Sequence, residues 1–155
     1  MHDNQGTVYL RRTVSQVIVD ASHERDAQID AQRNDVMRRC EPILPSLTDL
    51  RLRLSAAEVA RGRGLPNATA LERWLVLRRL PPFRRLRPWI CMDEMVSRFD
   101  DDQTLSHWAD EHGYRASVYY RFVARETGHQ WNDVKRLGRS WVRRHALNAW
   151  SAYLR

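Results

Sequence analysis

The chain has 155 residues, of which 43% are apolar and 29% charged, which is typical of one ordinary folded domain or two very small ones. It contains no apolar run of transmembrane length, and the segment MHDNQGTVYL lacks the layout of a secretory signal. We therefore expect a cytoplasmic protein without a membrane partner. The two cysteines, Cys40 and Cys91, lie far apart and outside any CxxC pair, which argues against a disulfide framework and a zinc knuckle.

The net charge of +7 is carried almost wholly by arginine, because Lys135 is the only lysine. The first 45 residues hold 6 basic and 7 acidic residues, a net charge of −1, whereas the remainder holds 20 basic and 12 acidic residues, a net charge of +8. A basic region rich in arginine favours nucleic-acid binding, since guanidinium groups pair with phosphates and guanine edges. An acidic protein partner or a solvated surface are the alternatives.

A long helix is predicted over residues 7–40, which contain neither proline nor glycine. Val14, Val17, Ile18 and Ala21 recur at i, i+3, i+4 and i+7, the spacing of an amphipathic helix. A thin apolar stripe continues at Ile29, Val36 and Cys40. Several arrangements fit this pattern: the helix protrudes or frays, it pairs with another chain, for example as a homodimer, or it packs on its own domain.

The segment CEPILPSLTD ends this helix, because Pro42 and Pro45 follow each other closely. We place a boundary here, with an N-terminal helical segment over residues 1–45 and a second part over residues 46–155. In the second part β-branched residues are sparse, and neither strand alternation nor a hairpin signal occurs. The expected fold class is therefore all-α.

Two segments of the second part align without gaps, SAAEVARGRGL from Ser55 and TLSHWADEHGY from Thr104. Ser55 and Thr104 are good helix N-caps, and Glu58 completes a capping box with Ser55. Near the end of each copy, Gly64 and Gly113 can adopt the positive φ that reverses the chain. Each copy thus predicts a short helix, a glycine turn and a second helix, which is helix-turn-helix geometry.

The region from roughly residue 50 to residue 145 resembles the DNA-binding region of AraC/XylS-type transcription regulators. The clearest match is GYRASVYYRFVARETGH, in which Gly113 and Tyr114 fall at the family's turn, Arg121 at its base-contacting arginine, and ETGH at the following turn. LERWL and LPPFRRLR match the first unit of the family. The resemblance implies two helix-turn-helix subdomains joined by a connecting helix, sequence-specific binding of double-stranded DNA through successive major grooves, and contact with RNA polymerase.

The second copy leads into a helix predicted over residues 116–126. Its apolar residues Tyr119, Phe122 and Val123 fall on one side and are expected to face the core. The opposite side carries groups that can reach base edges and phosphates, at Ser117, Tyr120, Arg121 and Arg125. The alternative is a half-buried Tyr120 between solvated arginines. The preceding glycine turn and the repeat favour the DNA-contacting interpretation.

In the first copy, Leu71 and Leu75 are expected inside, with Asn67 either on the outward face or acting as a helix N-cap. Five arginines flank the Pro81-Pro82 turn and predict a patch for the DNA backbone, namely Arg78, Arg79, Arg84, Arg85 and Arg87. A connecting helix is predicted from Pro88, with Trp89, Met92, Val96 and Phe99 on one face. The full set of predicted DNA contacts is Asn67, Thr69, Glu72, Arg73, Arg84, Arg85, Arg115, Ser117, Tyr120, Arg121, Arg125, Lys135 and Arg136.

Three other classes of function are alternatives to a transcription regulator. A helical adaptor would use the basic surfaces to bind an acidic protein, and a nonspecific nucleic-acid binder would show no preferred sequence. An enzyme is not expected, because the histidines are scattered and no carboxylate cluster pairs with them. No cofactor is expected, and the run Asp100–Asp102 is interpreted as a loop and helix entry instead of a metal site.

Overall fold

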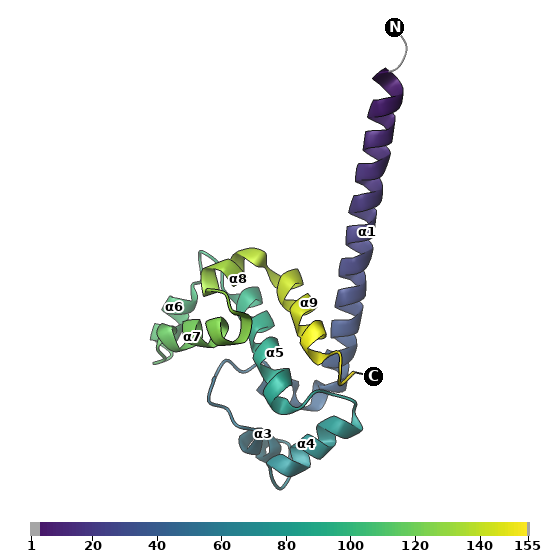
Figure 1. The fold of residues 1–155 in the computed structure, drawn as a ribbon. Helices are drawn as coiled ribbons and strands as arrows, with labels where there is room; N and C mark the ends of the chain where they lie inside the picture. Colours follow the sequence, from purple (N-terminus) through teal and green to yellow (C-terminus); the bar gives the residue numbers. More distant parts are fainter. Residues whose placement is uncertain (1–3, 155) are drawn as a thin grey trace.

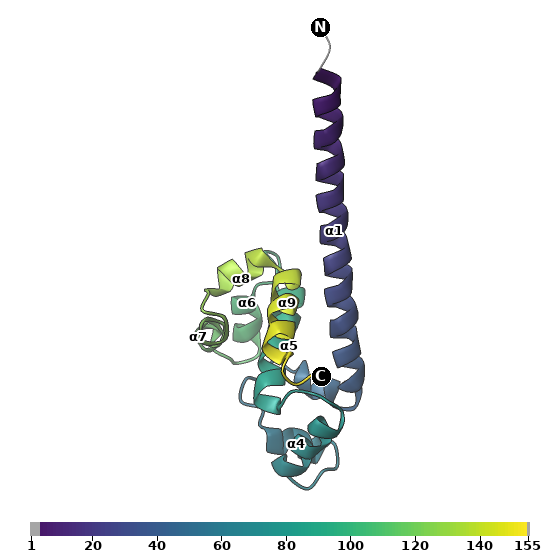
Figure 2. The same cartoon turned by 45° about the vertical axis from the view of Figure 1, so that its right-hand side comes forward.

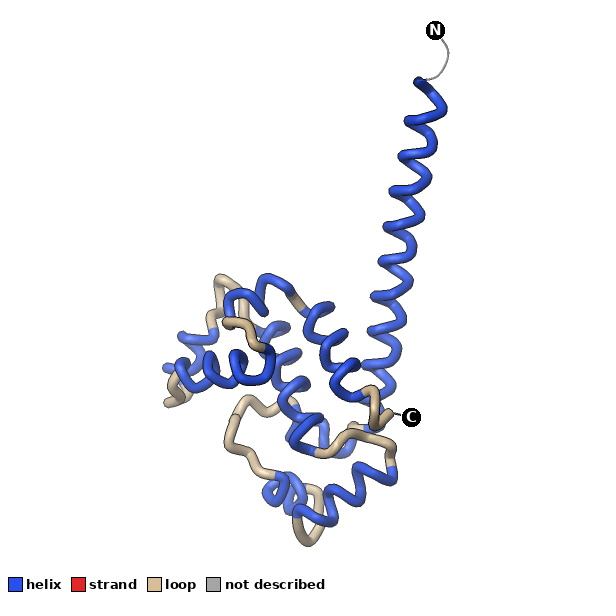
Figure 3. The backbone as a smooth tube through the Cα atoms, viewed as in Figure 1, coloured by secondary structure: helices blue, strands red, loops and turns tan. Residues whose placement is uncertain are grey.

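The computed structural model describes the backbone of residues 4–154 and the side chains of residues 14–154, and this part of the chain consists of helices joined by loops, without strands (Figures 1 and 3). The expected all-α class is confirmed. In chain order the elements are α1 (Asn4–Arg39), the 3-10 helix η1 (Glu41–Ile43), α2 (Leu44–Leu47), α3 (Ala56–Gly62), α4 (Ala68–Leu77), α5 (Phe83–Arg98), α6 (Leu105–Glu111), α7 (Ala116–Thr127), α8 (Trp131–Leu137) and α9 (Arg139–Trp150). No helix within residues 4–154 is long and apolar enough to cross a membrane.

Helix α1 has 36 residues, about 54 Å at 1.5 Å per residue, and most of it projects away from the rest of the molecule (Figures 1 and 2). Near its C-terminal end Val36 is completely buried. Farther out, Val14, Val17 and Ile18 are 56%, 61% and 63% exposed. The helix therefore packs on its own domain through one end and protrudes through the other.

Two hydrophobic cores lie along α5. The first joins α1 and the short helices after it to α3, α4 and α9, and its members include Val36, Ile43, Leu71, Leu86 and Trp150. The expected boundary after Pro45 falls inside this core. The second core joins α5 to α6, α7, α8 and the start of α9, and its members include Met95, Trp108, Phe122, Trp131 and Val142. Helices α5 and α9 supply buried side chains to both cores and so connect the two halves.

The connecting helix begins five residues earlier than predicted. Pro82 precedes the first residue of α5 with an extended backbone, ψ 151°, and Pro88 lies within the helix. Pro88 was predicted to lie in the first turn of this helix, but Pro82 is its N-cap and Phe83 is its first residue. Proline at 88 has no N–H to donate to the carbonyl four residues back, and the burial of Leu86 and Ile90 against the first core holds this turn in place.

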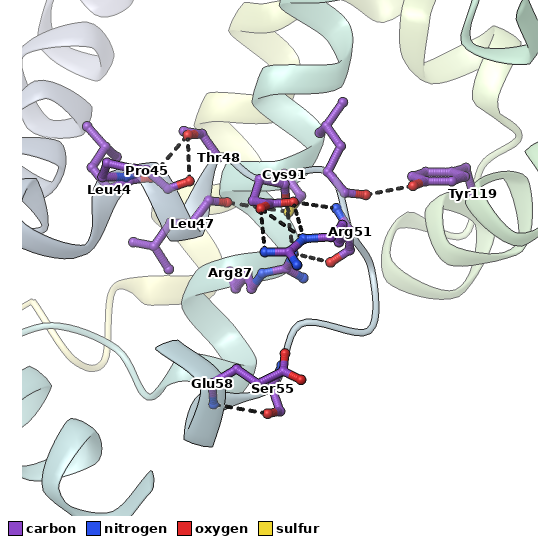
Figure 4. Close-up of polar contacts among 12 residues, drawn as sticks. Leu44, Pro45, Leu47, Thr48, Arg51, Ser55, Glu58, Arg87, Cys91 and Tyr119 are labelled. Atoms are coloured by element: carbon purple, nitrogen blue, oxygen red, sulfur yellow. Dashed lines mark hydrogen bonds and ion pairs between the residues drawn. The ribbon is translucent and has the colours of Figure 1, made fainter. Parts of the chain in front are cut away.

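Arg87 departs most clearly from its predicted role. It is only 6% exposed, and its Nη2 donates hydrogen bonds to the carbonyl oxygens of Asp49, at 2.9 Å, and Arg51 (Figure 4). Its place in a surface patch for the DNA backbone was therefore a wrong prediction. The guanidinium is buried because the loop between α2 and α3 offers carbonyl groups that have no helical partner.

An ion-pair network around the buried Asp93 fixes the packed end of α1. Asp93 of α5 lies 2.6 Å from Nη2 of Arg33 on α1 and 3.1 Å from Nε of Arg143 on α9. Nη1 of Arg143 also lies 2.8 Å from Asp30 on α1. Asp93 is buried away from water, and the two guanidinium groups compensate the charge of its carboxylate. Helices α1, α5 and α9 are thus joined by charge as well as by apolar packing.

Candidate nucleic-acid interface

The helix pairs α3–α4 and α6–α7 begin with equivalent N-caps. Ser55 Oγ accepts a hydrogen bond from the Glu58 backbone N–H at 3.2 Å, and the Glu58 carboxylate accepts one from the Ser55 N–H at 3.2 Å. This is the predicted capping box. At the second pair Thr104 Oγ1 accepts a hydrogen bond from the His107 N–H at 3.2 Å. In both pairs a hydroxyl group therefore satisfies a backbone donor of the first turn.

The turns of the two pairs have the same backbone geometry. Gly64 and Gly113 have φ values of 79° and 74°, in the left-handed region that glycine adopts without steric cost. One residue later, the Leu65 N–H donates to the carbonyl of Ala60, and the Tyr114 N–H donates to that of Ala109, each at 2.8 Å. The repeat in the sequence thus corresponds to a repeat in the hydrogen bonds.

The second helix of the second pair, α7, has the two faces that the sequence predicts. Tyr119, Phe122 and Val123 are buried in the second core. The outer face presents Ser117, Arg121 and Arg125 as exposed residues, with Tyr120 half-buried beside them. Arg115, which was predicted with them, is also exposed and precedes the helix directly.

The arginines of α7 differ in their surroundings. Arg125 Nε lies 3.5 Å from the carboxylate of Glu126, and its guanidinium stands 5.9 Å from the centre of the Phe122 ring. Within the described side chains Arg121 makes no ion pair. Arg121 therefore presents a full positive charge to any ligand that approaches this face.

The corresponding helix of the first pair, α4, presents fewer polar groups. Leu71 and Leu75 are buried as predicted, and Thr69 and Arg73 are exposed. The other two predicted DNA contacts, Asn67 and Glu72, make hydrogen bonds within the protein. Asn67 is the N-cap of α4, with its side-chain oxygen accepting from the Ala70 N–H at 2.9 Å, and Glu72 is half-buried and accepts from the Phe83 N–H at 3.3 Å. Asn67 thus has the alternative role considered for it.

An apolar end of α4 was missed by the sequence reasoning. Val76 and Leu77 are 71% and 82% exposed, beside a half-buried Trp74. The guanidinium of Arg78 lies 3.9 Å from the centre of the Trp74 ring and covers part of it. The spacing of Leu71 and Leu75 predicts one buried face of this helix, but the sequence does not show at which residue the contacts of α4 with the rest of the domain end.

The predicted phosphate contacts fall into two groups. Arg84 and Arg85 at the start of α5 are exposed, as are Arg78 and Arg79 before the turn. By contrast, Lys135 pairs with Asp101 at 3.1 Å and Arg136 pairs with Asp133 at 2.6 Å. A phosphate would have to displace these carboxylates, so the first group is the better basic surface.

The loop between α2 and α3 connects the two pairs. The Tyr119 hydroxyl, on α7, donates to the carbonyl of Leu50 at 2.7 Å (Figure 4). Burial raises the pKa of Tyr119 to about 12, so the phenol keeps its proton and remains a donor at neutral pH. The Asp49 carboxylate is partly buried, which opposes ionisation, but hydrogen bonds from Arg51 lower its pKa below the ordinary value.

Both cysteines are buried. Burial raises the pKa of Cys40 to about 12 and that of Cys91 to about 11, so both remain protonated thiols at neutral pH. Among the side chains of residues 14–154, no three His, Cys, Asp or Glu groups are placed to hold a metal ion. Comparisons of the chain with protein-family models, curated proteins and solved structures found no match.

Proposed function

We propose that this protein is a sequence-specific transcription regulator of AraC/XylS type that binds double-stranded DNA. The observation that carries the proposal is helix α7, which follows a glycine turn, buries three side chains and presents Ser117 and Arg121 on its exposed face. A helix of this kind fits the major groove, where an arginine can donate two hydrogen bonds to O6 and N7 of guanine. Arg121 is the proposed base-reading residue, with Ser117 and Tyr120 beside it.

In this proposal the first pair enters a neighbouring major groove through Thr69 and Arg73 of α4. The exposed arginines Arg84, Arg85, Arg115 and Arg125 contact phosphates, which supplies affinity that depends on salt. Lys135 and Arg136 contribute less, because each already has a carboxylate partner. The chain would thereby read a bipartite site whose two parts are about 10 base pairs apart.

The proposal extends to the partners of the protein. By resemblance to the family, the regulator would contact RNA polymerase and work in the bacterial cytoplasm at the nucleoid. The protruding end of α1 would pair with α1 of a second copy, because a helix without tertiary contacts is marginal in water and Val14, Val17 and Ile18 are exposed on it. Sedimentation equilibrium of the chain and of a Val17→Glu, Ile18→Glu variant tests this, with a monomeric wild-type chain as the contradicting result.

The deciding experiment is selection of bound fragments from a random duplex DNA pool at near-physiological salt. Wild-type protein, Arg73→Ala and Arg121→Ala are compared, with Arg38→Ala as the matched control because Arg38 is an exposed arginine of α1 and belongs to neither pair. We expect a bipartite motif that loses one half in each of the first two variants and is kept in the control. Retained DNA without any enriched motif would contradict sequence-specific regulation.

The second candidate function is a helical adaptor for an acidic protein. It is favoured by the end of α4, where exposed Val76 and Leu77 adjoin exposed Arg73 and Arg79, a combination suited to an amphipathic acidic segment. The same selection separates the two candidates, since the adaptor predicts no motif and no effect of Arg121→Ala.

A further inference from the structure

A cleft lies between the two helix pairs, apart from the outer faces of α4 and α7. Its volume is about 430 Å³, and its walls are the loop from Arg51 to Leu54, Glu58 of α3, and the stretch from Gly113 to Tyr119. This volume is within the range of small-molecule sites in proteins, roughly 300–1,000 Å³. Figure 4 shows part of the wall, with Arg51 and Tyr119 in the upper part of the view and Glu58 below them.

The walls of the cleft are mostly apolar. Leu52, Leu54 and Val118 are half-buried, Tyr119 is buried, and Tyr114 is exposed. The Tyr119 hydroxyl already donates a hydrogen bond to the carbonyl of Leu50, so Tyr119 presents its aromatic ring to the cleft instead of its hydroxyl. A ligand would therefore need an apolar or aromatic body to displace water from these surfaces.

The polar groups of the cleft are predominantly cationic. Three arginines line it against one carboxylate, and that carboxylate, of Glu58, is engaged in the capping box. Arg51 is paired with Asp49, with Nη2 2.9 Å from the carboxylate. Arg53 and Arg115 are exposed and make no ion pair with any other described side chain. Two guanidinium groups beside an apolar wall are suited to one anionic group on an apolar body.

We propose that this cleft binds a small organic acid, a single carboxylate attached to an aromatic or aliphatic body. The carboxylate pairs with Arg53 and Arg115, and the body lies on Leu52, Leu54 and Val118. A polyphosphate would leave the apolar wall uncovered, and an organic cation would meet three arginines. The proposal does not rest on the proposed DNA binding, although Arg115 belongs to both surfaces.

The test is a titration of the whole chain with 2-naphthoate, without DNA, followed by the amide chemical shifts in nuclear magnetic resonance spectra. We expect saturable shifts concentrated at Leu52, Gly113 and Val118. Two probes separate the parts of the ligand: 2-naphthol has the rings without the carboxylate, and acetate has the carboxylate without the rings. Each should bind at least tenfold more weakly than 2-naphthoate, because each lacks one of the two interactions.

Variants locate the carboxylate. Arg53→Gln and Arg115→Gln should each weaken 2-naphthoate binding about tenfold, whereas Arg61→Gln, an exposed arginine of α3 outside the cleft wall, should leave it unchanged. Circular dichroism confirms that the variants are folded. Shifts scattered over the surface, equal binding of 2-naphthol, equal loss with Arg61→Gln, or no shift at millimolar probe would each overturn the proposal. None of these results depends on whether the protein binds DNA.

Discussion

The helix pairs α3–α4 and α6–α7 share the geometry of their first N-cap and of their glycine turn but differ in their surfaces. Both have a hydroxyl N-cap, a glycine with positive φ and the same hydrogen bond after it. On α7 the exposed face holds Ser117 and Arg121, whereas α4 ends in exposed Val76 and Leu77. Caps and turns thus determine the shape of a pair, while the outer positions remain independent of it. If both pairs bind DNA, we expect the second pair to contribute more to sequence specificity than the first.

The interiors of the pairs differ as well. The second pair is filled by aromatic rings, with the Trp108 ring centre 5.7 Å from that of Tyr119 and 5.5 Å from that of Phe99. The first pair is filled by aliphatic residues such as Leu71 and Leu75. Tyr119 corresponds to Ala70 in the repeat, so only the second pair can reach the carbonyl of Leu50 with a side chain at this position.

The largest loss of stability is expected from substitutions that create a cavity in one core at a time. Leu71→Ala should lower the free energy of unfolding by about 2–5 kcal/mol and Phe122→Ala by about 3–5 kcal/mol, because each leaves a cavity. Urea unfolding followed by circular dichroism and by tryptophan fluorescence measures both. Since α5 contributes to both cores, the two signals should change together in each variant. Separate transitions would show that the pairs are independent folding units.

A smaller effect tests the exposed faces. Arg121→Ala should weaken binding to the selected DNA site by about 1–3 kcal/mol, and Arg73→Ala by less, since α4 offers fewer neighbouring polar contacts. Fluorescence anisotropy with a labelled duplex measures the affinities, with Arg38→Ala as the control. An equal or larger loss with Arg73→Ala would reverse the ranking of the two pairs.

The hydrogen bond from Tyr119 can be removed without emptying the core. Tyr119→Phe should lower the free energy of unfolding by about 1–3 kcal/mol, because the buried carbonyl of Leu50 loses its donor. Thermal unfolding measures this change. A variant as stable as the wild type would mean that water replaces the phenol at this carbonyl, and that the loop is not fixed to the second pair by this bond.

The smallest difference is expected at the N-caps. Ser55→Ala and Thr104→Ala should each cost about 0.5–2 kcal/mol of stability, with the greater loss at Ser55 because the capping box also occupies the Glu58 side chain. Glu58→Gln retains an acceptor and serves as the control at the first cap. A greater loss at Thr104 would show that the capping box adds nothing measurable.

Local patterns in the sequence were sufficient for much of this structure. Periodicity predicted the helices and the buried faces at Leu71, Tyr119 and Phe122, and the spacing of caps and glycines predicted both turns, because these features depend on neighbours within one or two helical turns. The predicted DNA contacts remain untested, although the exposure of Ser117 and Arg121 was anticipated from the same periodicity.

The errors concern contacts between distant residues. Arg87 looked like its arginine neighbours in the sequence, but its partners are carbonyl groups 36 and 38 residues away. The Glu72 carboxylate accepts a hydrogen bond from the backbone N–H of Phe83, 11 residues later in the chain at the start of α5. The ion pairs of Asp93 join three helices, and no local spacing indicates them. The cleft was also missed, because a loop and a turn far apart in the chain form its walls.

The shared helix α5 acts as a spacer with a defined phase. Its 16 residues span about 24 Å, and each residue advances the helix by about 1.5 Å and 100°. Insertion of one residue between the buried contributions to the two cores would turn one pair relative to the other by more than a quarter of a revolution. Insertion of four would nearly restore the angle while moving the pairs about 6 Å apart. The length of α5, together with α9, which also packs into both cores, therefore fixes the relative orientation of the two surfaces.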